Sequence, residues 1–332
     1  MPTRETAPSH PRASEPALDV LIVGGGPAGL SAALVLGRCL RRVLICDSGH
    51  PRNAASHALH GYLSRDGTAP SEFLQIGREQ LAPYETVAFR KIKVEKIEGA
   101  IGRFSALLEG GERIAARMVL IATGLVDELP DIENFRQFYG VSAHNCPYCD
   151  GWEHRGQPIA VLGCNKDAAE LALELRLWSQ DIVLCTNAGP SCDREVLDLL
   201  RRNEVEVIRK PIARLEGTGP QVERVVFQDG STSERSALFF SPGQYQRSPL
   251  AEMLGCEFCE EDGCVQCGED AATCVPGVFV AGNASRGLQL VIAAAAEGAH
   301  AAHAINGALL EADAEQGAVT SGDERQAVPI PA

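Results

Sequence analysis

Two cysteines separated by two residues form the part of the sequence best suited to redox or metal chemistry. Cys146 and Cys149 enclose Pro147 and Tyr148, and Asp150 follows directly. Such a pair can form a disulfide that exchanges two electrons, can supply half of a metal site, or can be two neighbouring thiols without a role.

Two histidines, His144 and His154, flank this pair. They could assist proton transfer, although surface or structural histidines are commoner. A helix that starts at the pair is expected to lower the pKa of one thiol, which would provide a thiolate near neutral pH.

A second set of cysteines has a different spacing. Cys256 and Cys259 are followed by Cys264 and Cys267, with Cys274 nearby. Two such pairs suggest a zinc or iron–sulfur site, but four residues between the pairs is short for a zinc clip. The segment EFCEEDGCVQC also predicts a hairpin around its acidic turn. A metal site, an auxiliary disulfide or reactive thiol set, and incidental hairpin cysteines all stay open, and no metal is assigned.

The composition limits the class of protein. The chain has 332 residues, a net charge of −14 and 12 cysteines, which is long enough for about two domains. The negative charge argues against nucleic-acid and anionic-membrane partners. Residues 1–16 lack the apolar run of a signal peptide, and no run of about 20 apolar residues marks a membrane span.

These features predict a cytoplasmic protein whose thiols stay reduced unless they are redox-active. We expect residues 1–16 and 313–332 to be flexible tails, because both are polar and contain proline. Four other cysteines lie in apolar segments and are predicted to be packed thiols: Cys39, Cys46, Cys164 and Cys185.

A glycine-rich turn near the start of the chain predicts a nucleotide site. Gly24, Gly26 and Gly29 follow an apolar strand and open a helix rich in Ala and Leu. The first glycine makes the turn, the second lets N–H groups approach a pyrophosphate, and the third lets the helix pack on the strand. Asp47 ends the next strand, where it can accept a hydrogen bond from a ribose hydroxyl.

The same strand, turn and helix pattern recurs about 140 residues later, which predicts two related Rossmann-like domains. In this second turn Gly163 is kept, but Asn165 and Ala168 replace the second and third glycines. Asn165 puts a side chain where a pyrophosphate would lie, and the next strand lacks both a ribose-binding acid and an arginine cluster. NAD(P)H binding is therefore expected to be weak or absent, unless other residues build the site.

The chain resembles the low-molecular-weight thioredoxin reductase family of FAD disulfide oxidoreductases. The motifs that carry the resemblance are GGGPAG at 24–29, IATG at 121–124, CPYCDG at 146–151, and VFVAGN and LQLVIAAAAEGA within 278–299. The resemblance implies an α/β fold with two Rossmann-like, three-layer ββα-type domains. It places an FAD domain at 17–126 and 248–312, and an inserted NAD(P)-type domain with the CxxC pair at 127–247.

The resemblance also implies roles for single residues. Cys149 would face the flavin and exchange electrons with its C4a atom, Cys146 would form the mixed disulfide with substrate, and Asp150 would donate or accept the proton. The implied FAD-binding residues are Gly24, Gly26, Pro27, Ala28, Gly29, Asp47, Arg52, His60, Ala122, Gly124, Gly282, Asn283, Gln289 and Leu290. Asn283 stands where the family usually has an Asp, so its contact with the ribityl chain would carry no charge.

The segments CDSGHPRNAASHALHGYLSRDG and CPYCDGWE are similar to the gliotoxin and holomycin dithiol oxidase branch, and the family's His-Arg-Arg phosphate motif is missing. These features favour oxidation of a small-molecule dithiol to a disulfide, with electrons passing through FAD to O₂. The alternatives are a thioredoxin reductase that uses NADPH or another donor, such as a ferredoxin or a second flavin, and a redox sensor without turnover. The resemblance implies a homodimer and a small-molecule dithiol or thioredoxin-like protein as partner.

Overall fold

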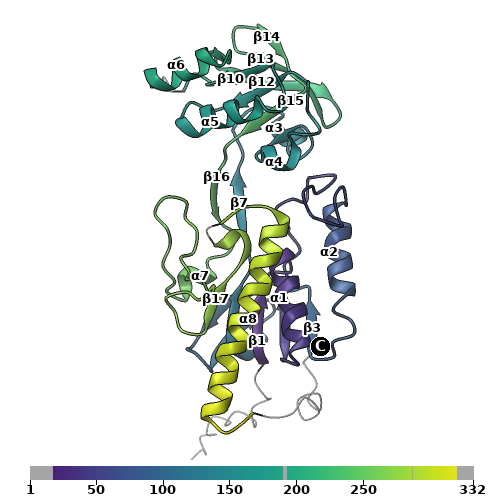
Figure 1. Cartoon of the computed structure of the whole chain (residues 1–332), viewed down its shortest axis with the longest axis vertical. Coiled ribbons are helices and arrows are strands. Elements are labelled where there is room, and N and C mark those ends of the chain that lie inside the picture. The colour runs from purple at the N-terminus through teal and green to yellow at the C-terminus, as the bar shows by residue number, and fades with distance from the viewer. Residues whose placement is uncertain (1–17, 190–192, 286, 320–332) are drawn as a thin grey trace, which may run out of the picture.

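The computed structural model describes residues 18–189, 193–285 and 287–319. They form two units joined by a narrow connector (Figure 1). The connector is the antiparallel pair β7 (Leu125–Glu128) and β16 (Gly243–Gln246). The second unit is therefore inserted into the first, which the chain after β16 completes. This arrangement confirms the α/β class with two Rossmann-like domains. The tail expected at 1–16 and residues 320–332 lie outside the described residues.

The first unit is built on a sheet with the order β3-β2-β1-β6-β5-β4, and β17 pairs with β6. The strands β1, β2, β3 and β17 run parallel to their neighbours, whereas β4 and β5 form antiparallel pairs beside β6. Their bounds are Leu18–Val23, Val43–Cys46, Val87–Arg90, Val94–Glu98, Phe104–Leu108, Arg113–Ile121 and Val278–Val280 for β1 to β6 and β17.

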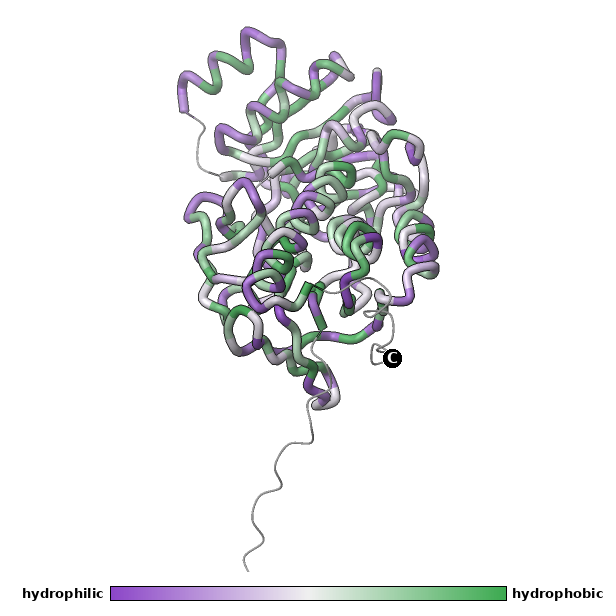
Figure 2. The backbone as a smooth tube through the Cα atoms, turned by 60° about the horizontal axis from the view of Figure 1, so that its bottom comes forward, coloured by the Kyte–Doolittle hydropathy of each residue, from purple (hydrophilic) through white to green (hydrophobic). Residues whose placement is uncertain are grey.

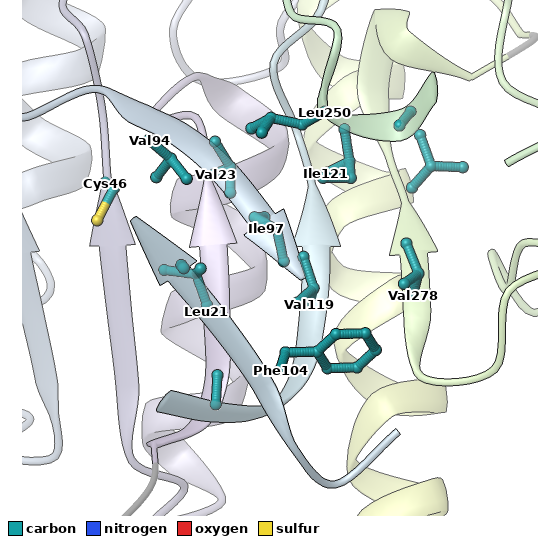
Figure 3. Close-up of a cluster of buried hydrophobic side chains, with 14 of the residues drawn as sticks. Leu21, Val23, Cys46, Val94, Ile97, Phe104, Val119, Ile121, Leu250 and Val278 are labelled. Atoms are coloured by element: carbon teal, nitrogen blue, oxygen red, sulfur yellow. The ribbon is translucent and has the colours of Figure 1, made fainter. Parts of the chain in front are cut away.

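Helices cover one face of this parallel sheet, and the β4–β5 pair covers the other. The helices are α1 (Pro27–Arg38), α2 (Pro70–Glu79) and α8 (Val291–Glu315), and α1 packs along α8. A buried cluster fills the space on the β4–β5 side, where Leu21, Ile97 and Phe104 meet (Figure 3). Each fully buried side chain of this kind stabilises the fold by about 1.5–3 kcal/mol. The first unit thus has three layers, with the carboxyl ends of β1, β2 and β6 facing the connector.

The second unit repeats the plan. Its sheet has the order β11-β10-β9-β15-β8, with the meander β12-β13-β14 and one short helix, residues 135–138, on one side and the helices of residues 166–175 and 194–202 on the other. The strand bounds are Ala143–His144, Ile159–Leu162, Ile182–Cys185, Glu206–Ile208, Ile212–Thr218, Gln221–Phe227, Thr232–Glu234 and Ala237–Phe240 for β8 to β15. The helices are α3 (Phe135–Phe138), α4 (Pro147–Asp150), α5 (Lys166–Leu175) and α6 (Arg194–Arg202). The strands β2, β9 and β10 consist of buried apolar residues, whereas hydrophilic and hydrophobic stretches alternate along the helices at the rim of the molecule (Figure 2).

Two expectations need correction. The acidic tail does not begin at residue 313, because α8 continues to Glu315 and Asp313 is buried between Arg41 and Arg117, at 2.8 and 2.7 Å. Cys39 is exposed at the end of α1 and is not a packed thiol.

The other three cysteines that were predicted to be packed thiols differ in burial. Burial raises the pKa of Cys46 and of Cys185 to about 12, as expected for packed thiols. Cys164 is only half-buried. No helix among the described residues has the length and apolar character that crossing a membrane requires.

Candidate active site

The cysteine pair lies on a single helical turn at the base of the second unit. Cys146 precedes α4 as its N-cap, and the structure joins it to Cys149 by a disulfide, with a Cα–Cα distance of 5.3 Å. The backbone N–H of Cys149 donates to Sγ of Cys146 at 3.2 Å. Because α4 has only four residues, this one N–H, rather than a long helix, would stabilise negative charge on the Cys146 sulfur. Both cysteines are half-buried.

Asp150 is the first member of a polar chain behind the pair. Its carboxylate lies 3.3 Å from Nδ1 of His144, and Nε2 of His144 lies 3.0 Å from Nε2 of His154. Both histidines are buried, and both rings contact the ring of Phe239. Burial and the neighbouring His144 lower the pKa of His154, so the neutral form is favoured there. His144 lines the cavity described below, whereas His154 lies behind it.

The first glycine turn is open to a ligand. Gly24 has φ +111°, and a Cβ there would lie 2.3 Å from the carbonyl oxygen of Ala122. A Cβ on Gly29 would lie 1.9 Å from the carbonyl oxygen of Gly24, so this glycine allows the helix to pack on the turn. Gly26, by contrast, has no atom within 4 Å of its Cβ position, and it caps α1 without a side-chain hydrogen bond. The N–H groups at the start of α1 therefore face open space.

One cavity of about 890 Å³ brings the predicted residues together. It spans the first turn, the connector and the cysteine pair. Every predicted site residue except Gly29 lines it: Gly24, Gly26, Pro27, Ala28, Asp47, Arg52, His60, Ala122, Gly124, Cys146, Cys149, Asp150, Gly282, Asn283, Gln289 and Leu290. Gly29 is instead part of the packing beneath the turn. Asn283 lies in the short 3₁₀ helix η1 (Gly282–Ala284).

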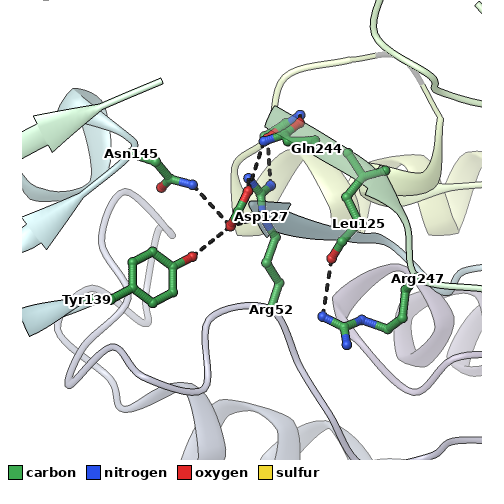
Figure 4. A network of polar contacts seen from close by, with 8 residues as sticks. Arg52, Leu125, Asp127, Tyr139, Asn145, Gln244 and Arg247 are labelled. Atoms are coloured by element: carbon green, nitrogen blue, oxygen red, sulfur yellow. Dashed lines mark hydrogen bonds and ion pairs between the residues drawn. The ribbon is translucent and has the colours of Figure 1, made fainter. Parts of the chain in front are cut away.

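A polar network around Asp127 connects the two units at this cavity (Figure 4). Arg52, from the first unit, forms a bidentate ion pair with Asp127, at 2.8 and 2.5 Å. Tyr139 and Asn145, from the second unit, donate to the same carboxylate at 2.7 and 3.2 Å. Gln244 of β16 donates to it at 3.0 Å. We call these five residues the Asp127 network.

The electrostatics of this network favour an ionised carboxylate. Burial opposes ionisation, but the hydrogen bonds and charge of Arg52, with the donors Tyr139 and Gln244, outweigh it, so the pKa of Asp127 lies below its usual value. Since Asn145 directly precedes Cys146, the network positions the cysteine pair over the cavity. Sequence reasoning missed Asp127, Tyr139 and Gln244, because their partners are far apart in the chain.

The second glycine turn is closed by its own side chains. Asn165 caps α5, and its Oδ1 accepts from the backbone N–H of Ala168 at 3.1 Å. Its Nδ2 donates to Asp167 at 3.3 Å, which places a carboxylate in the first turn of α5. Asn187, after β10, accepts from the N–H of Ile212 at 2.6 Å. One N–H at the start of α5, that of Ala168, is thus already used by the Asn165 side chain, and a carboxylate lies in the same helical turn.

Comparisons with known proteins agree with this architecture. The family model described as pyridine nucleotide-disulphide oxidoreductase matches residues 18–298. A probable thioredoxin reductase of Arthroderma benhamiae is 30% identical and covers 83% of this chain and 76% of its own length. The crystal structure of HlmI is 38% identical with a TM-score of 0.84, over 91% of this chain and 95% of that one. A putative thioredoxin reductase TrxB from Bacillus anthracis is 33% identical with a TM-score of 0.84, over 89% and 99%.

The chain therefore belongs to the pyridine nucleotide-disulphide oxidoreductase family. Its relatives make it a thioredoxin reductase-like disulfide oxidoreductase, an FAD-dependent enzyme that acts on sulfur groups. The predicted resemblance is thereby confirmed.

The residues of the first unit fit FAD. The open side of Gly26 and the uncapped start of α1 can take a pyrophosphate, and Asp47, directly after β2, lines the same cavity and can accept from a ribose hydroxyl. The hydroxyl of Thr123 is buried in the cavity lining and has no hydrogen-bond partner among the described residues. A buried polar group without a partner is costly unless a ligand satisfies it. Thr123 was missed by sequence reasoning, although it lies inside the IATG motif.

Proposed function

We propose that this protein oxidises a small-molecule dithiol to a disulfide through Cys146 and Cys149, with O₂ as the final acceptor. The observation that carries the proposal is the closed second turn. An enzyme that took electrons from NADPH would need phosphate donors in the second unit, and Asn165 and Asp167 occupy that place. The first turn is open in the same chain, so the difference lies in the second unit and not in the fold type.

The reaction balances with the residues at hand. One substrate thiol attacks Sγ of Cys146, the disulfide breaks, and Cys149 leaves as a thiol. The second substrate thiol then attacks the mixed disulfide, which releases the closed product and the Cys146 thiol. Bound FAD would supply the two-electron acceptor that restores the disulfide, and O₂ would take those electrons onward.

The proton steps fall to Asp150 and the histidines behind it. Asp150 would accept a proton from the attacking substrate thiol. Its contact with His144 at 3.3 Å holds the carboxylate in place and links it to the buried, neutral His154. The roles proposed for the cavity-lining residues are those implied by the family resemblance, from Gly24 to Leu290.

The surroundings of the pair favour a small partner over a protein. Cys146 and Cys149 are half-buried in the cavity lining. The rings of Tyr148 and Trp152, beside them in sequence, are 64% and 63% exposed, and could hold an apolar substrate. With the net charge of −14, an acidic thioredoxin-like protein would be repelled. We further propose a cytoplasmic homodimer with no nucleic-acid or membrane partner.

The test is an anaerobic titration of the purified yellow holoenzyme. NADPH, NADH and dithiothreitol are added separately, and the flavin absorbance is followed. We expect rapid bleaching with dithiothreitol only, and reoxidation on admission of air. Rapid bleaching by NADPH at low concentration would instead support a thioredoxin reductase.

Matched variants test whether electrons from dithiothreitol reach the flavin through the cysteine pair or by direct reduction of the flavin. Cys149→Ser should lose bleaching by dithiothreitol at least about 100-fold while it still binds FAD. Cys185→Ser removes a buried thiol of the second unit that is no part of the cavity lining and should leave the rate unchanged. A holoenzyme that binds FAD, yet is bleached by none of the three reductants, would favour a redox sensor.

A further inference from the structure

The hairpin after α7 (Leu250–Met253) contains two cysteines in directly opposed positions. Phe258 and Val265 form an antiparallel bridge. On either side of it, the N–H of Cys259 donates to the carbonyl of Cys264 at 2.8 Å, and that of Gln266 to Glu257 at 2.9 Å. This register makes Cys259 the cross-strand neighbour of Cys264. Their side chains share one face, opposite to that of Phe258 and Val265.

This register suits a disulfide. Directly opposed residues of an antiparallel pair have Cα atoms about 4.5–5.5 Å apart, and disulfides span about 4.4–6.8 Å. We propose that Cys259 and Cys264 form a second redox pair, separate from Cys146 and Cys149, that closes to a disulfide when it meets a small-molecule disulfide. No group of three or more metal-ligating side chains occurs in the described ranges.

Burial assigns the order of attack. Cys264 is 3% exposed and Cys259 is half-buried, so Cys259 meets the oxidant first and Cys264 resolves the mixed disulfide. The thiolate of Cys259 attacks the small disulfide RSSR and releases one RSH. Cys264 then attacks Sγ of Cys259 and releases the second RSH. Two protein thiols are oxidised and one RSSR is reduced to two thiols, so electrons and protons balance.

The charge of the protein selects the oxidant. The net charge is −14, and Glu260, directly after Cys259, is exposed. This negative charge repels an anionic disulfide and attracts a cationic one. The pair should therefore react faster with cystamine, which is cationic, than with glutathione disulfide, and added salt should narrow the difference.

The hairpin is hydrogen-bonded to the connector and to Ala284, the residue after the cavity-lining Asn283. Nε2 of Gln246, the last residue of β16, donates to the carbonyls of Gly263 and Ala284, each at 3.0 Å. The N–H of Val265 donates to Ala284 as well, at 2.9 Å. Since Ala284 follows Asn283 in the cavity lining, a Cys259–Cys264 bond would fix the loop that holds this end of the connector. That the enzyme's own disulfide product is the natural oxidant rests on the proposed function, but the pairing itself does not.

Peptide mapping tests the pairing. The full-length holoenzyme is incubated with cystamine, alkylated, and cleaved after glutamate, which cuts between the two cysteines at Glu260 and Glu261. We expect peptides 258–260 and 262–269 to be linked by a disulfide, and this cross-link to disappear with dithiothreitol. The Cys149→Ser variant, which cannot turn over, should form the same cross-link. The pairing of Cys259 with Cys264 can therefore be tested even if the proposed function fails.

Two matched variants define the partner of Cys259. The second peptide also contains Cys267, so the Cys267→Ser variant should still form the cross-link. Cys264→Ser should lose it and leave cysteamine attached to Cys259. The proposal is overturned if the wild-type protein keeps cysteamine on Cys259 without forming the cross-link, or if neither cysteine reacts. It is also overturned if the cross-link persists in Cys264→Ser.

Discussion

The two glycine turns of this molecule have the same strand, turn and helix around them but opposite surfaces. At the start of α1, Gly26 leaves the N–H groups open and the first helical turn carries no acid. At the start of α5, the side chain of Asn165 takes the N–H of Ala168, and Asp167 adds negative charge. One backbone plan therefore gives an anion site in the first unit and a self-capped helix in the second.

This difference between the two turns indicates what the second unit contributes to the cavity. It retains the fold of a nucleotide domain, but its residues at the cavity are those of the cysteine pair and the Asp127 network. In the proposed function, its role is to present a disulfide to the first unit. Four experiments can break or sharpen this contrast.

The largest effect is expected from filling the open turn. Gly26→Val keeps an allowed backbone, since φ is −76° and ψ −174°, but its side chain enters the pyrophosphate path. FAD affinity should fall by at least about 100-fold, or about 3 kcal/mol, as measured by fluorescence titration of the apoprotein. Gly307→Val, which also has no atom within 4 Å of its Cβ position, is the matched control and should bind FAD normally. Wild-type affinity in Gly26→Val would refute the role of this turn.

Next in size is the loss of the charge that joins the units. In Asp127→Asn, Arg52 loses its counter-ion. The side chains of Arg52 and Asp127 are only 18% and 3% exposed, so the unpaired guanidinium would lie in a half-buried place. Breaking such a pair costs about 3–5 kcal/mol, to be measured by urea unfolding, and bleaching by dithiothreitol should slow.

The control for that variant is an exposed ion pair of the second unit. Asp198 and Arg201 of α6, whose side chains are 46% and 77% exposed, form such a pair, and Asp198→Asn should cost less than about 1 kcal/mol. Equal effects of the two substitutions would show that the Asp127 network does not hold the units together.

A smaller effect concerns pH. The pKa of His154 is lowered in the folded protein by burial and by His144. The stability that this neutral histidine contributes is therefore complete above its unfolded pKa of about 6.5 and is lost as pH falls from there through the folded value. The melting temperature should drop between pH 7 and pH 5, and His154→Gln should reduce the drop. His303→Gln, at an exposed position of α8, should leave it unchanged.

The smallest effect tests the self-capped turn. Asn165→Ala removes the cap of α5 and should cost about 1 kcal/mol, whereas Asn165→Gly should cost only a few tenths. FAD content and bleaching by dithiothreitol should not change in either variant, and NADPH should still fail to bleach the flavin. Rapid bleaching by NADPH in Asn165→Gly alone would mean that this one side chain is the whole block.

Several features followed from short segments of sequence. The turn at Gly24–Gly29, the CxxC pair and the repeat of the nucleotide-type unit depend on local spacing, so the fold class and the family could be predicted. The burial of Cys46 and Cys185 followed from apolar strands in the same way. Cys39 and Asp313 were predicted wrongly because each lies at or beyond the expected end of a helix, where exposure depends on neighbours distant in sequence.

The amino-acid sequence by itself determined the two Rossmann-like units, the open first turn and the blocked second one, because each depends on backbone conformations set within about thirty residues. Only the tertiary structure decided that Arg52 and Tyr139 meet on the carboxylate of Asp127, and that the hydroxyl of Thr123 has no hydrogen-bond partner among the described residues. The physical reason is that these contacts join segments whose pairing is fixed by strand register and by packing across the connector, which no local pattern encodes.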